Sequence, residues 1–288
     1  MENTVHYDYI VKKLRTFFKE RDFVEVPTST RLSILAACED PRTVTTYSIG
    51  NQLWPLPQSG QMWLEMELLK NRDMKGAFCI GPSYRNEPNI IPGRHKRVFP
   101  LCDFESHGSI DDLRAFETDL LVYLGFERPT QVLYEDACER YGVELIEAEQ
   151  EARMAQDVSS SIMLERFPQR SNPYFVMKKR PDGLYNKIDV LLYGAETIGS
   201  SERSVNPQEM RDLFYTTSDG QFAELLFKNF GKDRVLKELD EYLNLNHMPR
   251  FGGGIGITRL ERAMEFAGLL DMPKMLYPGW QSTAQISL

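Results

Sequence analysis

The sequence has few cysteines, no excess of positive charge and no long apolar run. Its four cysteines are far apart and form no Cys-x-x-Cys pair, which argues against zinc and thioredoxin-type sites. The 34 Lys and Arg residues are outnumbered by 42 Asp and Glu, and the formal charge of −8 disfavours polyanions except at a focused basic site. No apolar stretch approaches the ~18 residues of a membrane span, and no secretory signal is evident. We expect a cytoplasmic protein with no membrane partner.

The composition, with 42% hydrophobic, 26% charged and 11% aromatic residues, is typical of a soluble globular chain. Helical and strand-like patterns follow one another without an internal repeat or an evident linker. We predict an α+β fold, in which an antiparallel sheet is flanked by helices, and a single domain over residues 1–288.

Local patterns place the individual elements of this fold. Helices are predicted at 6–21, 60–72, 111–123, within 206–230, at 233–244 and at 258–266. Strands are predicted at 23–26, 76–87, 98–105, 174–179, 185–193 and 251–257. Residues 134–170 are expected to be mixed helix and loop, and the strands at 76–87 and 98–105 to form a long-looped hairpin.

A glycine-rich segment, Gly252-Gly-Gly-Ile-Gly-Ile-Thr-Arg259, joins the last predicted strand to a helix. Glycines on a strand let a ligand approach the backbone, and an arginine at the start of the next helix can bind phosphate. Taken alone, the segment could equally be a tight turn between a strand and a helix.

Charged residues cluster around the predicted hairpin. Arg85 and Glu87 share one face by the strand period of two, and so do Asp103 and Glu105 on the other strand. The loop at 93–99 carries four residues that are or can be cationic, followed by an aromatic ring. Such a loop can clamp a polyphosphate while the ring stacks on a base. A solvated basic loop with a core phenylalanine remains the alternative.

Together these segments resemble motifs 2 and 3 of the class II aminoacyl-tRNA synthetases. Arg-x-Glu at Arg85, the loop with Arg-His, Phe and Asp-x-Glu are similar to motif 2, and Gly-x-Gly-x-Gly-x-x-Arg ending at Arg259 to motif 3. The first helix with Phe-Val-Glu-Val and Pro27 resembles motif 1, the dimer-forming segment. The resemblance spans about 21–262, with 125–180 matched only loosely, and it implies the class II fold and a homodimer.

Two further segments resemble the asparaginyl and aspartyl members of that family. Ser59-Gly-Gln61, with Glu65 four residues on, is similar to the amino-acid-binding segment of the asparaginyl enzymes. Asp189 and Glu196, followed by Gly-Ser-Ser-Glu-Arg203, are similar to the segment that holds Mg-ATP and the substrate side chain.

Carried over residue by residue, the resemblance implies a site for ATP, Mg²⁺ and an amino acid. Arg85 would hold the α-phosphate, His95 and Arg259 the outer phosphates, and Phe99 the adenine. The implied ATP-binding residues are Arg85, Glu87, His95, Phe99, Glu196 and Arg259, of which Arg85 and Arg259 are the implied catalytic residues. The implied metal ligands are Asp189 and Glu196, and the implied amino-acid-binding residues are Ser59, Gln61, Glu65 and Arg203.

Glu65 and Arg203 bear on the choice of amino acid. Gln61 and Glu65 lie four residues apart on a predicted helix, so both can reach the same ligand. The aspartyl enzymes have a lysine where Leu64 stands, whereas a carboxylate follows it here. If Arg203 donates to the side-chain oxygen of the substrate and Glu65 accepts from its NH2 group, the pair complements a neutral amide. Asparagine or a related amino acid is therefore favoured over aspartate. The alternative is that Glu65 faces solvent.

The resemblance implies an ATP-dependent ligase that forms an aminoacyl adenylate, and we expect it to pass the acyl group to a small nucleophile. The family's tRNA synthetases carry an N-terminal anticodon-binding barrel, and here motif 1 begins almost at once, which with the negative charge disfavours tRNA as a partner. The alternatives are an asparagine synthetase acting on aspartate and ammonia, a minimal asparaginyl-tRNA synthetase, and a non-catalytic paralogue that binds a ligand or partner.

Overall fold

A computed structural model describes residues 3–27, 32–34, 40–88, 90 and 96–270. In this part of the chain an eight-stranded sheet has the order β1 (Phe23–Glu25), β4 (Gly76–Tyr84), β5 (Val98–His107), β10 (Arg250–Gly256), β9 (Ala195–Glu202), β8 (Tyr185–Leu192), β7 (Ser161–Phe167), β6 (Thr130–Leu133). Only the outer pairs, β1 with β4 and β6 with β7, are parallel. The predicted α+β fold of a single domain with a mainly antiparallel sheet is confirmed.

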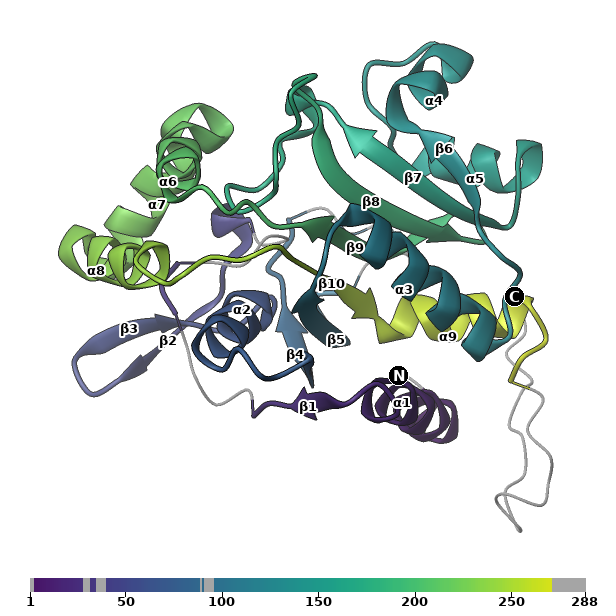
Figure 1. Cartoon of the computed structure of the whole chain (residues 1–288), viewed down its shortest axis with the longest axis horizontal. Coiled ribbons are helices and arrows are strands. Elements are labelled where there is room, and N and C mark those ends of the chain that lie inside the picture. Colours follow the sequence, from purple (N-terminus) through teal and green to yellow (C-terminus); the bar gives the residue numbers. More distant parts are fainter. Residues whose placement is uncertain (1–2, 28–31, 35–39, 89, 91–95, 271–288) are drawn as a thin grey trace.

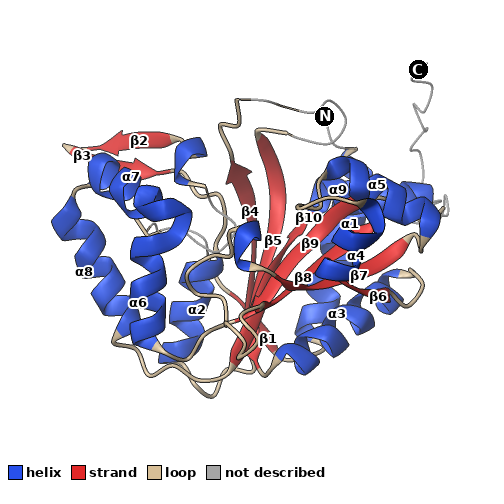
Figure 2. Ribbon diagram, turned by 90° about the horizontal axis from the view of Figure 1, so that it is seen from above, coloured by secondary structure: helices blue, strands red, loops and turns tan. Residues whose placement is uncertain are grey.

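Helices cover both faces of this sheet (Figures 1 and 2). They are α1 (Thr4–Lys19), α2 (Gln61–Lys70), α3 (Ile110–Leu124), α4 (Tyr134–Tyr141), α5 (Ala148–Asp157), α6 (Pro207–Thr216), α7 (Gln221–Phe230), α8 (Lys232–Leu243) and α9 (Ile257–Phe266). A separate hairpin pairs β2 (Thr46–Ile49) with β3 (Gln52–Pro55). None of the helices in the described ranges has the length and apolar character of a membrane span.

The main hydrophobic core lies between the sheet and helices α1, α3 and α9 (Figure 2). At its centre Phe18 of α1 stacks on Phe78 of β4 at 4.7 Å between ring centroids, and Phe104 of β5 packs beside them. A second core joins α2 to α6, α7 and α8, and a third lies between α4, α5 and the strands β7 and β8. Burial of these apolar side chains is the main force that holds the helices against the sheet.

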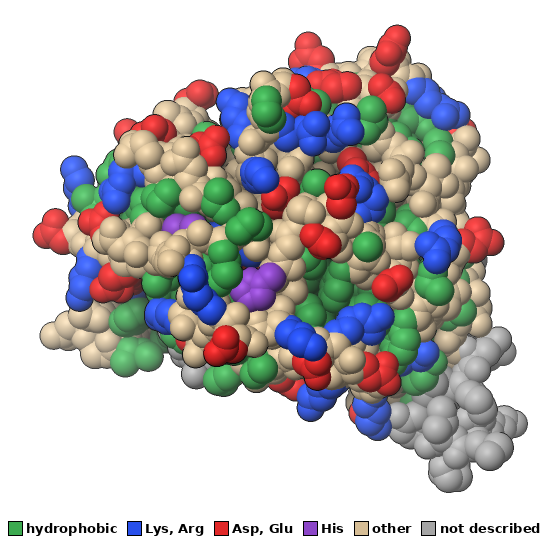
Figure 3. Space-filling view, viewed as in Figure 1, with side chains coloured by type: hydrophobic (Ala, Val, Ile, Leu, Met, Phe, Trp, Pro, Cys, Tyr) green, Lys and Arg blue, Asp and Glu red, His purple; other side chains and the backbone are tan. Residues whose placement is uncertain are grey.

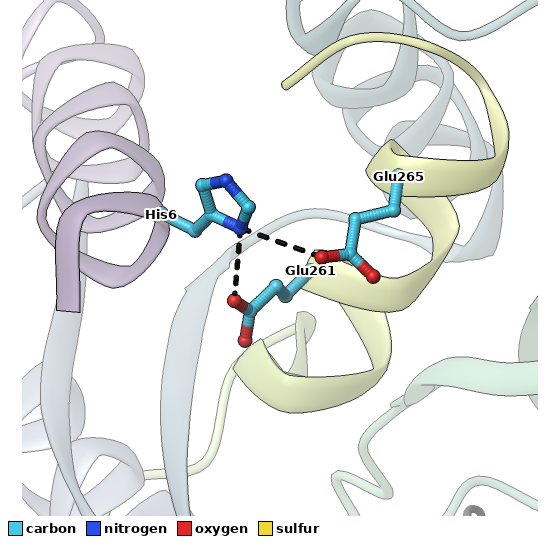
Figure 4. Close-up of side chains that lie close together, drawn as sticks. All are labelled: His6, Glu261 and Glu265. Carbon is cyan, nitrogen blue, oxygen red and sulfur yellow. Dashed lines mark hydrogen bonds and ion pairs between the residues drawn. The ribbon is translucent and has the colours of Figure 1, made fainter. Parts of the chain in front are cut away.

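The first and last described helices are also joined by polar contacts. Nδ1 of His6 in α1 lies 3.2 Å from Oε1 of Glu261 and 3.4 Å from Oε1 of Glu265, both in α9 (Figure 4). Asn3 caps α1 with its side chain and donates its backbone N–H to Glu261. The N-terminal helix is therefore fixed to the helix that follows the glycine-rich strand.

Most predicted elements are confirmed, including the hairpin of β4 and β5, and Ser109 caps α3. The predicted strand at 76–87 ends earlier, at Tyr84. The predicted helical region at 206–230 is two helices, because Ser218 and Asp219 have positive φ angles and break it.

Two predictions about strands are wrong. Residues 174–179 form only isolated bridges, at Met177 and Lys179, and not a strand. Conversely β7 lies in the region expected to be helix and loop. It pairs on both edges and is almost wholly buried, so it lacks the alternation by which a half-buried strand is recognised.

The motif 1 segment is also less exposed than we expected. The resemblance predicts a dimer surface of Phe23, Val24 and Val26, but Phe23 is 8% exposed, Val26 is 7% exposed, and Val24 alone is open at 46%. The strand is short; Phe23 at its start and Val26 just after its end turn inward toward the cores. A dimer surface here would use Val24 and neighbouring polar side chains.

Candidate active site

The register of the central strands places a stripe of glycines between two sets of charged residues. One row across β5, β10, β9 and β8 reads Glu105, Gly252, Ser201, Lys187. The next row reads Asp103, Gly254, Gly199, Asp189. Because alternate residues of a strand point to the same face, these side chains gather on one face of the sheet.

The glycines leave room for the carboxylates beside them. A Cβ atom at Gly252 would overlap the carboxylate of Glu105, and one at Gly254 would lie 3.0 Å from Oδ1 of Asp103. The glycine-rich segment is therefore not only a turn before α9. Within the strand, Gly252 and Gly254 must lack side chains because Glu105 and Asp103 of the adjacent strand occupy that space.

A cavity of about 380 Å³ opens over these rows. It is lined by seven of the residues predicted for the site: Gln61, Arg85, Glu87, Phe99, Glu196, Arg203 and Arg259. His95 lies outside the described residues. A cavity of this size is in the range of small-molecule sites in proteins.

Arg85 and Phe99 form one wall of the cavity. The guanidinium carbon of Arg85 lies 5.3 Å from the centroid of the Phe99 ring. Nε of Arg85 is buried and has no hydrogen-bond partner in the described part of the chain. A buried donor without a partner is costly, so a ligand that accepts from it would gain a strong, charge-assisted hydrogen bond.

Arg259 enters the cavity from the start of α9. Its Nη1 donates to the backbone carbonyl of Glu196 at 2.7 Å and lies 3.7 Å from Oε2 of the same residue. The side chain is thus directed toward β9, where its remaining donors can meet an anion.

Arg203 and Gln61 also line the cavity, and they contact each other. Arg203 is 1% exposed and donates from Nη1 to Oγ of Ser201 at 2.7 Å and from Nη2 to Oε1 of Gln61 at 3.2 Å. Its guanidinium also pairs with Glu105. Burial raises the pKa of Glu105, to about 8, and Arg203 opposes that rise. This arginine is held in place from three directions.

Glu65 lies beside Arg203, away from the cavity lining, and is 0% exposed. Its Oε2 accepts from Tyr242 at 2.7 Å and from Nη2 of Arg250 at 2.7 Å, and its Oε1 lies 3.5 Å from Nε of Arg203. Burial alone would raise the pKa of Glu65, but Arg250 and Arg203 outweigh burial and hold that pKa below its usual value. Glu65 is an ionised group beside Arg203, and it does not face solvent.

Ser59 contacts the same charged face through Asp103. Oγ of Ser59 donates to Oδ1 of Asp103 at 2.9 Å, and the N–H of Gly60 donates to Oδ2 at 2.8 Å. Oγ also accepts from the N–H of Gln61 at 3.0 Å. The pKa of Asp103 is raised to about 6, because burial raises it by more than these hydrogen bonds lower it. Ser59 therefore fixes the start of α2 against β5.

Asp189 and Glu196 have the chemistry and placement of a divalent-ion site. A Cβ atom at Gly199 would lie 2.8 Å from Oε1 of Glu196 and 3.6 Å from Oδ1 of Asp189, so both carboxylates converge over that glycine. Oδ1 of Asp189 is buried and has no hydrogen-bond partner among the described residues. Oxygen donors of this kind suit Mg²⁺, and the pair fits the predicted role.

Lys187 was not anticipated from the sequence. Its Nζ lies 2.6 Å from Oδ2 of Asp189, and it lines the cavity. Burial raises the pKa of Asp189, to about 7, while Lys187 opposes the rise and Glu196 adds to it. Lys187 and Asp189 are two residues apart on one strand, so their shared face could have been recognised. The pairing of Arg250 with Glu65 had no such local signal.

Solved structures of known proteins share the fold of this chain. Asparaginyl-tRNA synthetase from Entamoeba histolytica, solved in complex with asparaginyl-adenylate, superposes with a TM-score of 0.73 at 21% identity over 91% of this chain and 63% of its own. The enzyme from Pyrococcus horikoshii, also complexed with asparaginyl-adenylate, gives 0.74 at 17% identity over 90% and 64%. Aspartyl tRNA synthetase from Entamoeba histolytica gives 0.64 at 19% identity over 90% and 54%.

The chain thus spans less than two thirds of the length of these asparaginyl enzymes. A comparison with curated protein sequences gives no significant match. The family described as tRNA synthetases class II (D, K and N) matches residues 3–267, which is nearly the whole chain. The protein therefore belongs to the class II tRNA synthetases of the D, K and N group.

Proposed function

We propose that this protein is an ATP-dependent ligase that activates an amino acid as its adenylate, with AMP and pyrophosphate as products. The observation that supports this most directly is the convergence of Arg85, Phe99 and Arg259 on one cavity that Arg203 and Gln61 also line. The first group suits a nucleotide triphosphate, and the second suits a small polar molecule. The cavity joins the two.

The proposed reaction is the attack of a substrate carboxylate on the α-phosphorus of ATP. One anion approaches another, so fixed cations must offset the charge that develops. Nε of Arg85 is a buried donor available to the α-phosphate, with Phe99 beside it for the adenine. Arg259 would hold the outer phosphates as pyrophosphate leaves. Holding both reactants in one cavity also lowers the entropic part of the barrier.

Mg²⁺ bound by Asp189 and Glu196 would supply positive charge to the phosphates. Glu87 lines the same cavity and remains a proposed ATP-binding residue. His95 is retained in the proposal from the sequence alone.

The amino acid that the site favours is asparagine or a close relative. Arg203 already has two acidic side chains beside it, Glu65 and Glu105, and Glu65 is ionised because Arg250 and Arg203 hold its pKa low. An aspartate side chain would bring a further negative charge close to the ionised Glu65, which is costly in a buried site. A carboxamide adds none. Gln61 and Ser59 remain the proposed partners of its amino and carboxyl groups.

The acyl acceptor in this proposal is a small nucleophile, and tRNA is not required. Lys and Arg side chains are interspersed with Asp and Glu on the face shown in Figure 3, which does not offer a continuous basic track. A minimal asparaginyl-tRNA synthetase is the second candidate, favoured by the similarity to two asparaginyl enzymes. Asparagine synthesis from aspartate and ammonia is the third.

Pyrophosphate exchange with single variants tests the proposal. Arg85→Ala and Arg259→Ala should each lower the exchange rate by on the order of a hundredfold or more, because each removes a charge-assisted contact to the phosphates. Arg211→Ala is the matched control, since Arg211 forms an exposed ion pair with Asp240. Near-normal exchange by either site variant would refute the assignment. Acid-precipitable, RNase-sensitive label from total tRNA would instead support the second candidate.

A further inference from the structure

Lys187 is a mostly buried cation at the cavity, and it has no role in the reaction proposed above. It lies in β8, two residues before Asp189, with its side chain 22% exposed toward the cavity. On one side Nζ contacts Oδ2 of Asp189 at 2.6 Å, and on the other it lies 3.8 Å from the centroid of the Phe167 ring. A carboxylate and an aromatic face both attract an ammonium group, so the cation has a defined place.

The two oxygens of Asp189 therefore have different roles. Oδ2 is paired with Lys187, whereas Oδ1 is directed toward Gly199, over which Glu196 also lies. Glu196 in turn has Arg259 within 3.7 Å. Each carboxylate of the candidate metal site thus has a tethered cation beside it.

These four side chains are two carboxylates and two cations, so the site has no excess of negative charge before a ligand binds. A divalent ion that enters between Asp189 and Glu196 must approach Lys187 and Arg259, and like charges at short range in a partly buried site repel strongly. A triphosphate brings several negative charges and reverses this balance, because it can be shared by the divalent ion and both side chains.

We propose that Lys187 is a tethered phosphate-binding cation that makes divalent-ion binding at Asp189 and Glu196 dependent on nucleotide. The ligand class is a nucleoside triphosphate, so this inference rests on the proposed function. In it, Lys187 contacts the outer phosphates alongside the metal ion and keeps the metal site weak in the protein without nucleotide.

Manganese titration of the nucleotide-free protein, followed by electron paramagnetic resonance, tests whether Lys187 weakens metal binding. Lys187→Met removes the charge and keeps a long apolar side chain, so Mn²⁺ should bind at least about tenfold more tightly than to the wild type. Lys178→Met is the matched control, because Lys178 also pairs with a buried carboxylate, Glu202, at 2.7 Å. Its Mn²⁺ affinity should equal that of the wild type.

Equilibrium dialysis with ATP in excess EDTA tests whether Lys187 binds the phosphates. The wild type should bind ATP without metal, Lys187→Met should lose about tenfold or more in affinity, and Lys187→Arg should restore most of it. If Lys187→Met does not fold, Lys187→Gln replaces it in both assays.

Unchanged Mn²⁺ affinity in the folded Lys187 variant would overturn the inference. So would tight Mn²⁺ binding by the nucleotide-free wild type that Asp189→Asn abolishes. Failure of the proposed function has a different signature: no ATP binding by any variant, with or without metal, while the tighter Mn²⁺ binding of Lys187→Met persists.

Discussion

Arg250 donates two hydrogen bonds to a single oxygen of Glu65, from Nε at 3.1 Å and from Nη2 at 2.7 Å to Oε2. Both side chains are fully buried. Tyr242 completes the group, since its hydroxyl donates to the same Oε2 and accepts from Nη2 of Arg250. This contact ties the central strand β10 to α2 and α8, and it holds Glu65 beside Arg203.

Removing Arg250 should destabilise the protein strongly. Arg250→Met leaves Glu65 buried with less compensation, and loss of one partner of a buried ion pair costs about 3–5 kcal/mol. The double variant Arg250→Met with Glu65→Gln should recover part of that loss. Urea unfolding measures both, with Arg211→Met as the control, whose exposed ion pair is worth less than about 1 kcal/mol. A loss as small as that of the control would contradict this role.

Gly252 should tolerate no side chain. Gly252→Ala would place a Cβ atom against the carboxylate of Glu105, which is itself fixed by Arg203, so we expect a loss of about 1–3 kcal/mol in unfolding free energy. Gly256→Ala in the same strand is the control, because the nearest heavy atom would lie 3.7 Å away. Equal unfolding midpoints for the two variants would show that Glu105 can move aside.

Glu117 predicts a pH-dependent stability difference. It is fully buried in α3, and burial raises its pKa from 4.5 in the unfolded chain to about 8. The folded state therefore keeps a proton that the unfolded state releases, and this contribution to stability is present below pH 4.5 and is lost as the pH rises to about 8.

Glu117→Gln removes that titration. The variant should gain at least about 2 kcal/mol relative to the wild type between pH 5 and pH 8. Urea unfolding of both proteins at the two pH values gives the difference, and the other titrating groups cancel in the comparison. A gain that is the same at both pH values would show that the carboxyl group does not titrate as described.

We predict that the protein is a homodimer with twice its chain mass of 33.3 kDa. The exposed Val24 of β1 lies beside α1 and offers one apolar point for a twofold contact. Light scattering at micromolar concentration measures the mass, and Val24→Asp should shift it toward the monomer. A monomeric wild type would contradict the prediction.

The sequence predicts some parts of this site better than others. The resemblance to motifs 2 and 3 implies that Arg85, Phe99 and Arg259 share one site, and they do line one cavity. Asp103 and Glu105 were expected to share a face, which they do, but as buried partners of Ser59 and Arg203. Their burial depends on the glycine strand lying between β5 and β9, an order that no local pattern specifies.

Other parts depend on contacts between residues far apart in the chain. Arg250 is the first residue of the glycine-rich strand β10, yet its side chain meets Glu65, 185 positions earlier. The carboxylate of Glu65 was expected to face a ligand because of its helical spacing from Gln61. That spacing fixes a shared helix face, whereas the distance of each residue from the cavity depends on packing against α8.

Pyrophosphate exchange by the wild-type protein, screened over single amino acids without tRNA, tests the central claim most directly. We predict exchange that requires ATP and Mg²⁺ and is faster with asparagine than with aspartate, because Arg203 is already paired with the ionised Glu65. Exchange with aspartate and none with asparagine would contradict the substrate assignment, and no exchange with any amino acid, with or without total tRNA, would contradict amino-acid activation itself.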